Sequence, residues 1–138
     1  MLALVDAPRT DLWKELERCD VVWSTPSQDA AGSMPLGNGE VGVNLWVEPN
    51  GDLVFYLSRT DAWSEASRLL KLGRVRVRLN PAPLRPGAPF EQRLSLQNGR
   101  VELRAGDWRL RVFVDAASPV VYVEGSGRSP ASVTATAE

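Results

Sequence analysis

Short apolar runs recur about every ten residues from Asp20 onward, and this spacing limits the chain to folds built from strands. The runs are separated by Gly, Pro, Asn and Asp and cover residues 21–24, 40–48, 53–58, 73–79, 91–97, 100–105, 108–115 and 119–125. Runs of this length, bounded by turn residues, are typical of strands in antiparallel sheets. The pattern therefore predicts an all-β meander.

Residues 10–19 follow a helical period instead. Thr10 is a suitable N-cap, and Leu12, Leu16 and Cys19 are spaced as on one face of a helix. We predict one short helix here. Cys19 is the single cysteine of the chain, which excludes an intrachain disulfide and indicates a small, buried apolar side chain.

Asn50-Gly51 is the preferred residue pair for a two-residue hairpin loop. Such a loop places Val47 opposite Val54 and Trp46 opposite Phe55. Both faces of this hairpin are apolar, so we expect one face to meet a second sheet and the other to meet something else, such as a neighbouring domain.

Asn98-Gly99 and Gly106-Asp107 predict two more tight hairpins, in which Leu103 pairs with both Leu94 and Leu110. That face is aliphatic and belongs to the core. The opposite face carries a row of arginines at Arg93, Arg104 and Arg109, and the next strand to the N-terminal side alternates Arg74, Arg76 and Arg78 with apolar residues. These arginines form either a solvated face or a docking face for an acidic partner.

Composition excludes several classes of function. The chain has no histidine, which removes Ser-His triads, Cys-His pairs and the usual zinc sites, and we expect no metal and no cofactor. Its 16 basic and 17 acidic residues give a net charge of -1, which does not favour nucleic acid or a membrane surface as a partner. Residues 1–8 show neither the basic start nor the long apolar run of a signal peptide.

Glycine and proline concentrate before the strand at residues 40–48, which predicts a tight loop over Met34 to Glu40. This loop belongs to a set of motifs that recur in one family: Val22-Trp23, Gly32 to Gly39, Asn44 to Glu48, Thr60 to Trp63, Leu69 to Val77, Pro89-Phe90 and Phe113 to Ala116. In this order, over residues 20–125, they resemble the N-terminal β-sandwich domain of fucosidase-like glycosidases, which are similar to glycoside hydrolase family 95. The resemblance is closest to a branch described as a domain of unknown function.

The resemblance implies an antiparallel, supersandwich-like β-sandwich. Residues 1–19 would be an N-terminal extension with the short helix, and residues 20–125 the sandwich domain. Residues 126–138 would be a connector followed by the start of a truncated strand, because the alternation from Val133 stops at Glu138, which makes the sandwich incomplete. Relatives of this kind act outside the cytoplasm, which suggests a secreted or periplasmic location although no signal peptide is visible.

The resemblance also implies that catalysis lies elsewhere. In these enzymes the catalytic carboxylates sit on a helical barrel, so we expect no catalytic residue here and no activity of this chain alone. The loops at residues 34–40 and 59–65 would approach the rim of the active site, where Asn38, Asp61 and Trp63 are candidates for substrate contact. Three apolar side chains are candidates for packing against the barrel: Leu36, Trp46 and Phe55.

Three functions remain open. The first is a non-catalytic module of a fucosidase-like glycoside hydrolase that packs against a helical-barrel catalytic domain. The second is an independent carbohydrate-binding β-sandwich, which requires several exposed aromatic side chains, of which Trp63 is the best candidate. The third is a protein-interaction domain whose arginine-rich face binds an acidic surface.

Overall fold

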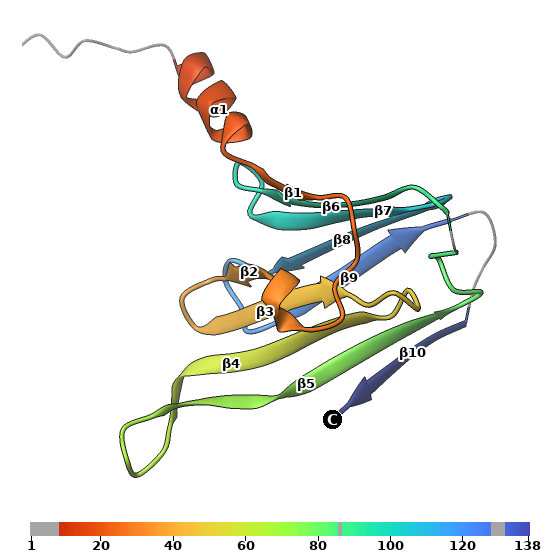
Figure 1. Ribbon diagram of the computed structural model, residues 1–138. Coiled ribbons are helices and arrows are strands. Elements are labelled where there is room, and N and C mark those ends of the chain that lie inside the picture. Colours follow the sequence, from red (N-terminus) through yellow and green to blue (C-terminus); the bar gives the residue numbers. More distant parts are fainter. Residues whose placement is uncertain (1–8, 86, 128–131) are drawn as a thin grey trace, which may run out of the picture.

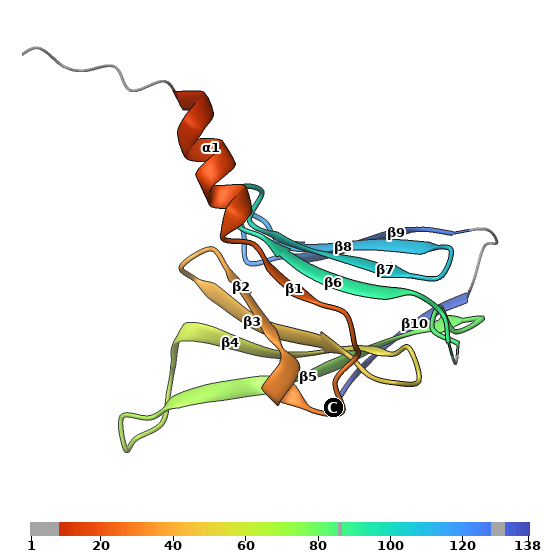
Figure 2. The same cartoon turned by 45° about the horizontal axis from the view of Figure 1, so that its top comes forward.

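Two antiparallel sheets packed face to face make up the computed structural model, which describes residues 9–85, 87–127 and 132–138 (Figure 1). Sheet A has the strand order β1-β6-β7-β8-β9, and sheet B has the order β10-β5-β4-β3-β2. One α-helix, α1 (Arg9–Arg18), precedes the sandwich and projects from its end (Figures 1 and 2). The predicted all-β sandwich with one short N-terminal helix is confirmed.

The strands of sheet A are β1 (Val21–Trp23), β6 (Phe90–Ser95), β7 (Arg100–Ala105), β8 (Trp108–Val114) and β9 (Val121–Ser126). The strands of sheet B are β2 (Met34–Gly37), β3 (Val41–Val47), β4 (Leu53–Trp63), β5 (Leu69–Asn80) and β10 (Ser132–Ala137). A short 3-10 helix, η1 (Ala30–Gly32), lies between β1 and β2. Each sheet is thus a four-strand meander to which one strand from elsewhere in the chain adds an edge.

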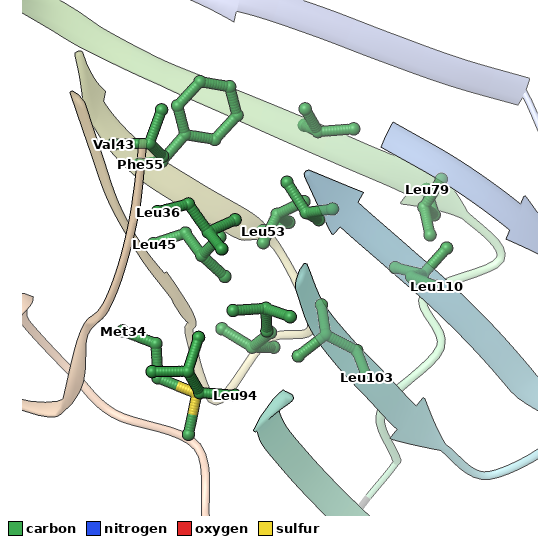
Figure 3. Close-up of a cluster of buried hydrophobic side chains, with 14 of the residues drawn as sticks. Met34, Leu36, Val43, Leu45, Leu53, Phe55, Leu79, Leu94, Leu103 and Leu110 are labelled. Atoms are coloured by element: carbon green, nitrogen blue, oxygen red, sulfur yellow. The ribbon is translucent and has the colours of Figure 1, made fainter. Parts of the chain in front are cut away.

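The core fills the space between the two sheets (Figure 3). Alternate residues of each strand point inward, which is the periodicity the sequence pattern required. Sheet B contributes Met34, Leu36, Val41, Val43, Leu45, Val47, Leu53, Phe55, Val77 and Leu79, and sheet A contributes Leu94, Val101, Leu103, Leu110 and Val112. Residues 81–85 and 87–89, between β5 and β6, belong to neither sheet, because their prolines have no N–H to donate to a ladder.

The register of β7 with β8 is the predicted one, with Leu103 opposite Leu110 across the Gly106-Asp107 turn. The register of β6 with β7 differs from the prediction by two residues. Ser95 pairs with Arg100, so the turn has four residues and not two, and Gly99 has the positive φ within it. The type I′ turn that a two-residue Asn-Gly loop adopts needs positive φ at both residues, and Asn98 is not in that conformation.

This shift keeps each residue of β6 on its predicted face but changes its cross-strand partner. Arg93 lies opposite Glu102, and Arg104 lies opposite Glu91 and Arg109. The predicted row of three arginines is therefore wrong. Only Arg104 and Arg109 lie side by side, and carboxylates interrupt the rest of the row.

The hairpin between β3 and β4 is also out of its predicted register, by one residue. Val47 pairs with Leu53 and Trp46 pairs with Val54. The backbone N–H of Gly51 donates to the Glu48 carbonyl, and Gly51 has a φ of 89°. Pro49 at the second position favours this type I turn with a left-handed glycine after it, which is a three-residue loop.

Two smaller expectations need comment. Cys19 is exposed, not buried, because α1 leaves the sandwich and packs little of its own surface. The second apolar face of the β3–β4 hairpin, where Trp46 is buried, is covered in part by the chain itself. Both views place η1 beside β3, and the Ser27 N–H donates to the Val47 carbonyl at 2.9 Å. Residues 1–8 of the predicted extension and 128–131 of the predicted connector lie outside the described residues.

Candidate functional site

One exposed part of the sandwich is the far end of the β4–β5 hairpin, residues 58–72, which we call the arm. β4 is buried at Leu53 and becomes progressively more exposed toward Trp63, and β5 shows the reverse trend from Leu69 onward. The arm extends past the strands of sheet A (Figures 1 and 2). Nothing in sheet A lies over it, so its side chains are not used by the core.

The backbone of the arm is less regular than the rest of the sheet. The β4–β5 ladder changes register between Leu57 and Ser58 and again between Ser58 and Trp63. Bulges of this kind bend a strand and increase its twist. The bend coincides with the point at which the hairpin leaves the sandwich, and beyond it the turn places Ser67 at a positive φ of 57°.

Large apolar side chains of the arm face solvent. Trp63 is 57% exposed and pairs with Leu69, which is 53% exposed. Leu70 and Leu72 are 43% and 50% exposed, and their neighbour Leu69 points to the other face, because side chains alternate along a strand. The arm is therefore apolar on both faces, which is unusual for a strand pair in water and makes the arm a candidate interaction site.

A groove lies at the base of the arm, with a cavity volume of about 360 Å³. Its walls come from β2, β3, β4 and the arm residues Leu69, Leu70 and Lys71. Tyr56 lines this groove and lies on the outer face of sheet B. Its ring lies 5.2 Å from that of Trp46, and the Lys71 ammonium lies 4.2 Å from the centre of the Tyr56 ring. A cation over an aromatic ring stabilises both side chains in place.

Two of the predicted substrate-contact residues, Asp61 and Trp63, are on the arm. Both residues belong to strand β4, whereas the sequence predicted a loop over residues 59–65. The Trp63 indole N–H donates to the Thr60 carbonyl at 2.7 Å, which fixes the ring and leaves its faces free. Asp61 pairs with Arg59, which also bonds Glu40 at 2.7 Å.

The third candidate, Asn38, is held by other residues of the chain. Its side-chain N–H₂ donates to the carbonyls of Asp115 and Ser118, and its oxygen accepts from the backbone of Glu40 and Val41. These bonds join the β2–β3 turn of sheet B to the β8–β9 turn of sheet A. The amide of Asn38 therefore links the two sheets, and few of its donors and acceptors remain free to bind a ligand.

The three candidates for packing against a second domain lie inside this one. Leu36 and Phe55 are part of the core between the sheets, and Trp46 is 2% exposed. Little of their surface remains for another domain to contact. The arm does expose apolar side chains, and three of them were not among the predicted site residues: Leu69, Leu70 and Leu72.

The arginines of β5 are matched by carboxylates of the same chain. Arg76 bonds Glu48 at 2.6 Å, Asp52 at 3.0 Å and Glu138 at 3.1 Å. Arg78 bonds Asp52 at 3.1 Å, and Arg74 bonds Glu138. Burial raises the pKa of Asp52, but hydrogen bonds from Arg78 and Arg76 outweigh it and hold that pKa below the ordinary range.

The described residues contain no group of three or more His, Cys, Asp or Glu side chains placed to hold a metal ion. Within the same ranges, no helix has the length and apolar content of a membrane span. The described residues offer an exposed apolar arm and a groove at its base.

Residues 22–138 match the family described as Domain of unknown function (DUF5703), through the model of its N-terminal domain. The chain belongs to this family. The match begins within β1 and includes both sheets and the arm, whereas α1 lies before it. No curated protein matches the chain.

The apolar surface of this DUF5703 domain had a signal in the sequence. Leu69, Leu70 and Leu72 stand in a run that breaks the alternation expected of a strand with one buried face. A strand that is apolar on both sides needs cover on both sides. The predicted strand began at residue 73, so these three leucines lay outside it.

Proposed function

We propose that this DUF5703 domain is a non-catalytic β-sandwich module of a fucosidase-like glycoside hydrolase. In this proposal the arm docks on a helical-barrel catalytic domain, and the Trp63 ring lies near the rim of the active site. The module orients the barrel and narrows its opening, while the reacting carboxylates belong to the barrel.

The observation that supports docking is the exposure of Trp63, Leu69, Leu70 and Leu72 on both faces of one hairpin. Exposed aromatic and aliphatic side chains gathered on one element are what the buried centre of a protein interface contains. The arm is also built from two paired strands, so docking does not require a disordered segment to fold.

The chemistry of the arm agrees with a place beside a sugar site. Trp63 presents the apolar ring faces that stack on a pyranose, and Asp61 is an exposed carboxylate two residues away that accepts hydrogen bonds from hydroxyls. One exposed indole with one carboxylate is too small a platform for strong sugar binding by the domain alone. This favours a rim contribution over an independent carbohydrate-binding module.

The test uses the polypeptide encoded after Glu138, expressed separately and titrated with this domain by calorimetry. We expect binding, and we expect Trp63→Ser to raise the dissociation constant about tenfold or more, because a buried tryptophan is a typical interface hot spot. Trp13→Ser is the matched control, since Trp13 is 47% exposed on α1, outside the sandwich. The control should bind like the unaltered domain.

Three results would contradict the proposal. The first is a gene that ends at the codon for Glu138. The second is equal weakening by the two tryptophan substitutions. The third is saturable binding of a monosaccharide or oligosaccharide by the domain alone, lost in Trp63→Ser, which would assign the independent carbohydrate-binding function instead.

A further inference from the structure

Three asparagines of the chain stand directly before a glycine, which is the arrangement in which an asparagine side chain loses ammonia most readily. They are Asn38, Asn50 and Asn98. In this reaction the backbone nitrogen of the glycine attacks the side-chain carbonyl carbon of the asparagine, and glycine allows the approach because it has no Cβ. The reacting dipeptide is the same at all three places, so the fold decides which of them reacts.

The side chain of Asn38 is held away from its glycine. It donates to the carbonyls of Asp115 and Ser118 at 2.8 and 3.0 Å, and its oxygen accepts from the two backbone N–H groups that follow Gly39, both at 2.9 Å. The side-chain carbonyl carbon reaches the Gly39 nitrogen only when these bonds break. The network that joins the two sheets therefore also protects this amide.

At Asn50 both reacting groups are engaged in the β3–β4 turn. The side-chain oxygen accepts from the Asp52 N–H at 2.9 Å, and the Gly51 N–H donates to the Glu48 carbonyl at 2.8 Å. Gly51 is also buried, whereas attack requires its nitrogen to lose a proton to solvent. This pair reacts only after the turn opens.

Asn98 lies in the four-residue turn between β6 and β7, and both it and Gly99 are exposed. Within the described residues its side chain makes one hydrogen bond, from Nδ2 to the Ser95 hydroxyl at 2.9 Å. Gly99 has a φ of 59°, and no atom of the described residues lies within 4 Å of the point where a Cβ would stand. Rotation of the Asn98 side chain toward the Gly99 nitrogen thus breaks one bond and meets no obstacle.

We propose that Asn98 is a site of spontaneous deamidation in the folded protein. The Gly99 nitrogen gives its proton to solvent and bonds the side-chain carbonyl carbon of Asn98. The bond from that carbon to Nδ2 breaks, and ammonia leaves a five-membered cyclic imide. Water then adds to one imide carbonyl and breaks its bond to nitrogen, which leaves an aspartate or an isoaspartate at position 98. Water is the only co-reactant.

The modification changes both the charge and the backbone of this turn. It adds one carboxylate, so the net charge of the chain goes from -1 to -2. In the isoaspartate product the main chain runs through the former side-chain carbon and gains one atom between β6 and β7. The modified molecules therefore separate from the unmodified chain by anion exchange.

Peptide mapping by mass spectrometry tests the proposal. The full chain is incubated in mildly alkaline buffer, folded or in concentrated urea, until half of the urea sample has lost the Asn98 amide. In urea the three asparagines should react at comparable rates. In the folded chain Asn98 should react at least about tenfold faster than Asn38 and Asn50, because those two react only from locally opened states.

Gly99→Asp is the matched control, since aspartate tolerates positive φ and its Cβ hinders attack by its own backbone nitrogen. Deamidation at Asn98 should be strongly slowed in this variant. Three results would overturn the proposal. They are an Asn98 amide that persists in the folded chain while it is lost in urea, equal rates at the three asparagines in the folded chain, and an unchanged rate in Gly99→Asp.

Discussion

Asn38 shows how a single polar side chain fixes the geometry of this sandwich. Its sequence context, between Gly37 and Gly39, indicates only a tight turn. Its N–H₂ bonds the carbonyls of Asp115 and Ser118, which lie 77 and 80 residues away along the chain. No local sequence pattern predicts such distant partners. The side-chain amide made Asn38 a candidate for ligand contact, and the same amide joins two turns.

Replacing Asn38 by Ala should lower the free energy of unfolding by about 1–3 kcal/mol, because it leaves half-buried carbonyl and N–H groups without partners. Asn98→Ala is the control, since the Asn98 side chain makes one hydrogen bond, to Ser95, and the expected loss is about 1 kcal/mol or less. Urea denaturation of both variants measures the difference. Equal losses would mean that the four bonds of Asn38 contribute no more than one.

Stability should decrease in acid through Asp52. The folded-state pKa of this carboxyl is below its ordinary value, so its contribution is present above the unfolded-state value of about 4 and is lost as the pH falls through the folded-state pKa. We expect the free energy of unfolding to fall below about pH 4. In Asp52→Asn this fall should be shallower, while Asp107→Asn, at an exposed turn residue, should keep the slope of the unaltered chain. An unchanged slope in Asp52→Asn would contradict the assignment.

At the scale of strands, the sequence predicted which segments pair more reliably than it predicted the register of each pair. Eight of the strands begin or end within a residue or two of a predicted apolar run, because alternation and turn residues are local signals. Register was correct only for β7–β8. At Asn50-Gly51 the preceding Pro49 favoured a three-residue loop, and at Asn98-Gly99 the turn extended back to Leu96. Loop length depends on φ values that a dipeptide alone does not determine.

The β6–β8 meander offers a direct test of the observed faces. Leu103 is buried opposite Leu110 and Gln92, whereas its neighbour Arg104 is exposed. Leu103→Ala should cost about 2–5 kcal/mol of unfolding free energy, and Arg104→Ala should change it by about 0.5 kcal/mol or less. Chemical denaturation of the two variants distinguishes them. A larger loss for Arg104→Ala would place the wrong face of β7 in the core.

The candidate site was only partly predictable. Trp63 was identified from the sequence because a family motif includes it. The three leucines that share the arm with it also stand in a family motif, but they were not predicted as site residues, because their exposure depends on where sheet A ends relative to sheet B. Likewise the burial of Leu36, Trp46 and Phe55 depends on packing between strands that are distant in the sequence.

For the whole molecule, we predict no glycosidase activity in the isolated chain. Glycoside hydrolysis uses two carboxyl groups that flank the scissile bond. Two of the carboxylates on or beside the arm, Glu40 and Asp61, form ion pairs with Arg59, so both are engaged by a side chain of the same chain. Aryl glycosides incubated with the pure chain should release no aglycone above the buffer rate. Turnover that is lost in Asp61→Asn would refute this prediction.

The way the chain alternates between the two sheets has a consequence for folding during synthesis. When a growing chain has emerged through Asn80, β2 to β5 can form a meander, but its inner face has nothing to pack on. β1 must wait for β6, whose residue Leu94 pairs with Val21, and the opposing layer is complete only after β9. Long-range pairing of this kind is slow and leaves apolar strands exposed on the ribosome. We expect nascent chains shorter than about 125 residues to be bound by chaperones and degraded readily by proteases, and to become resistant in one late step.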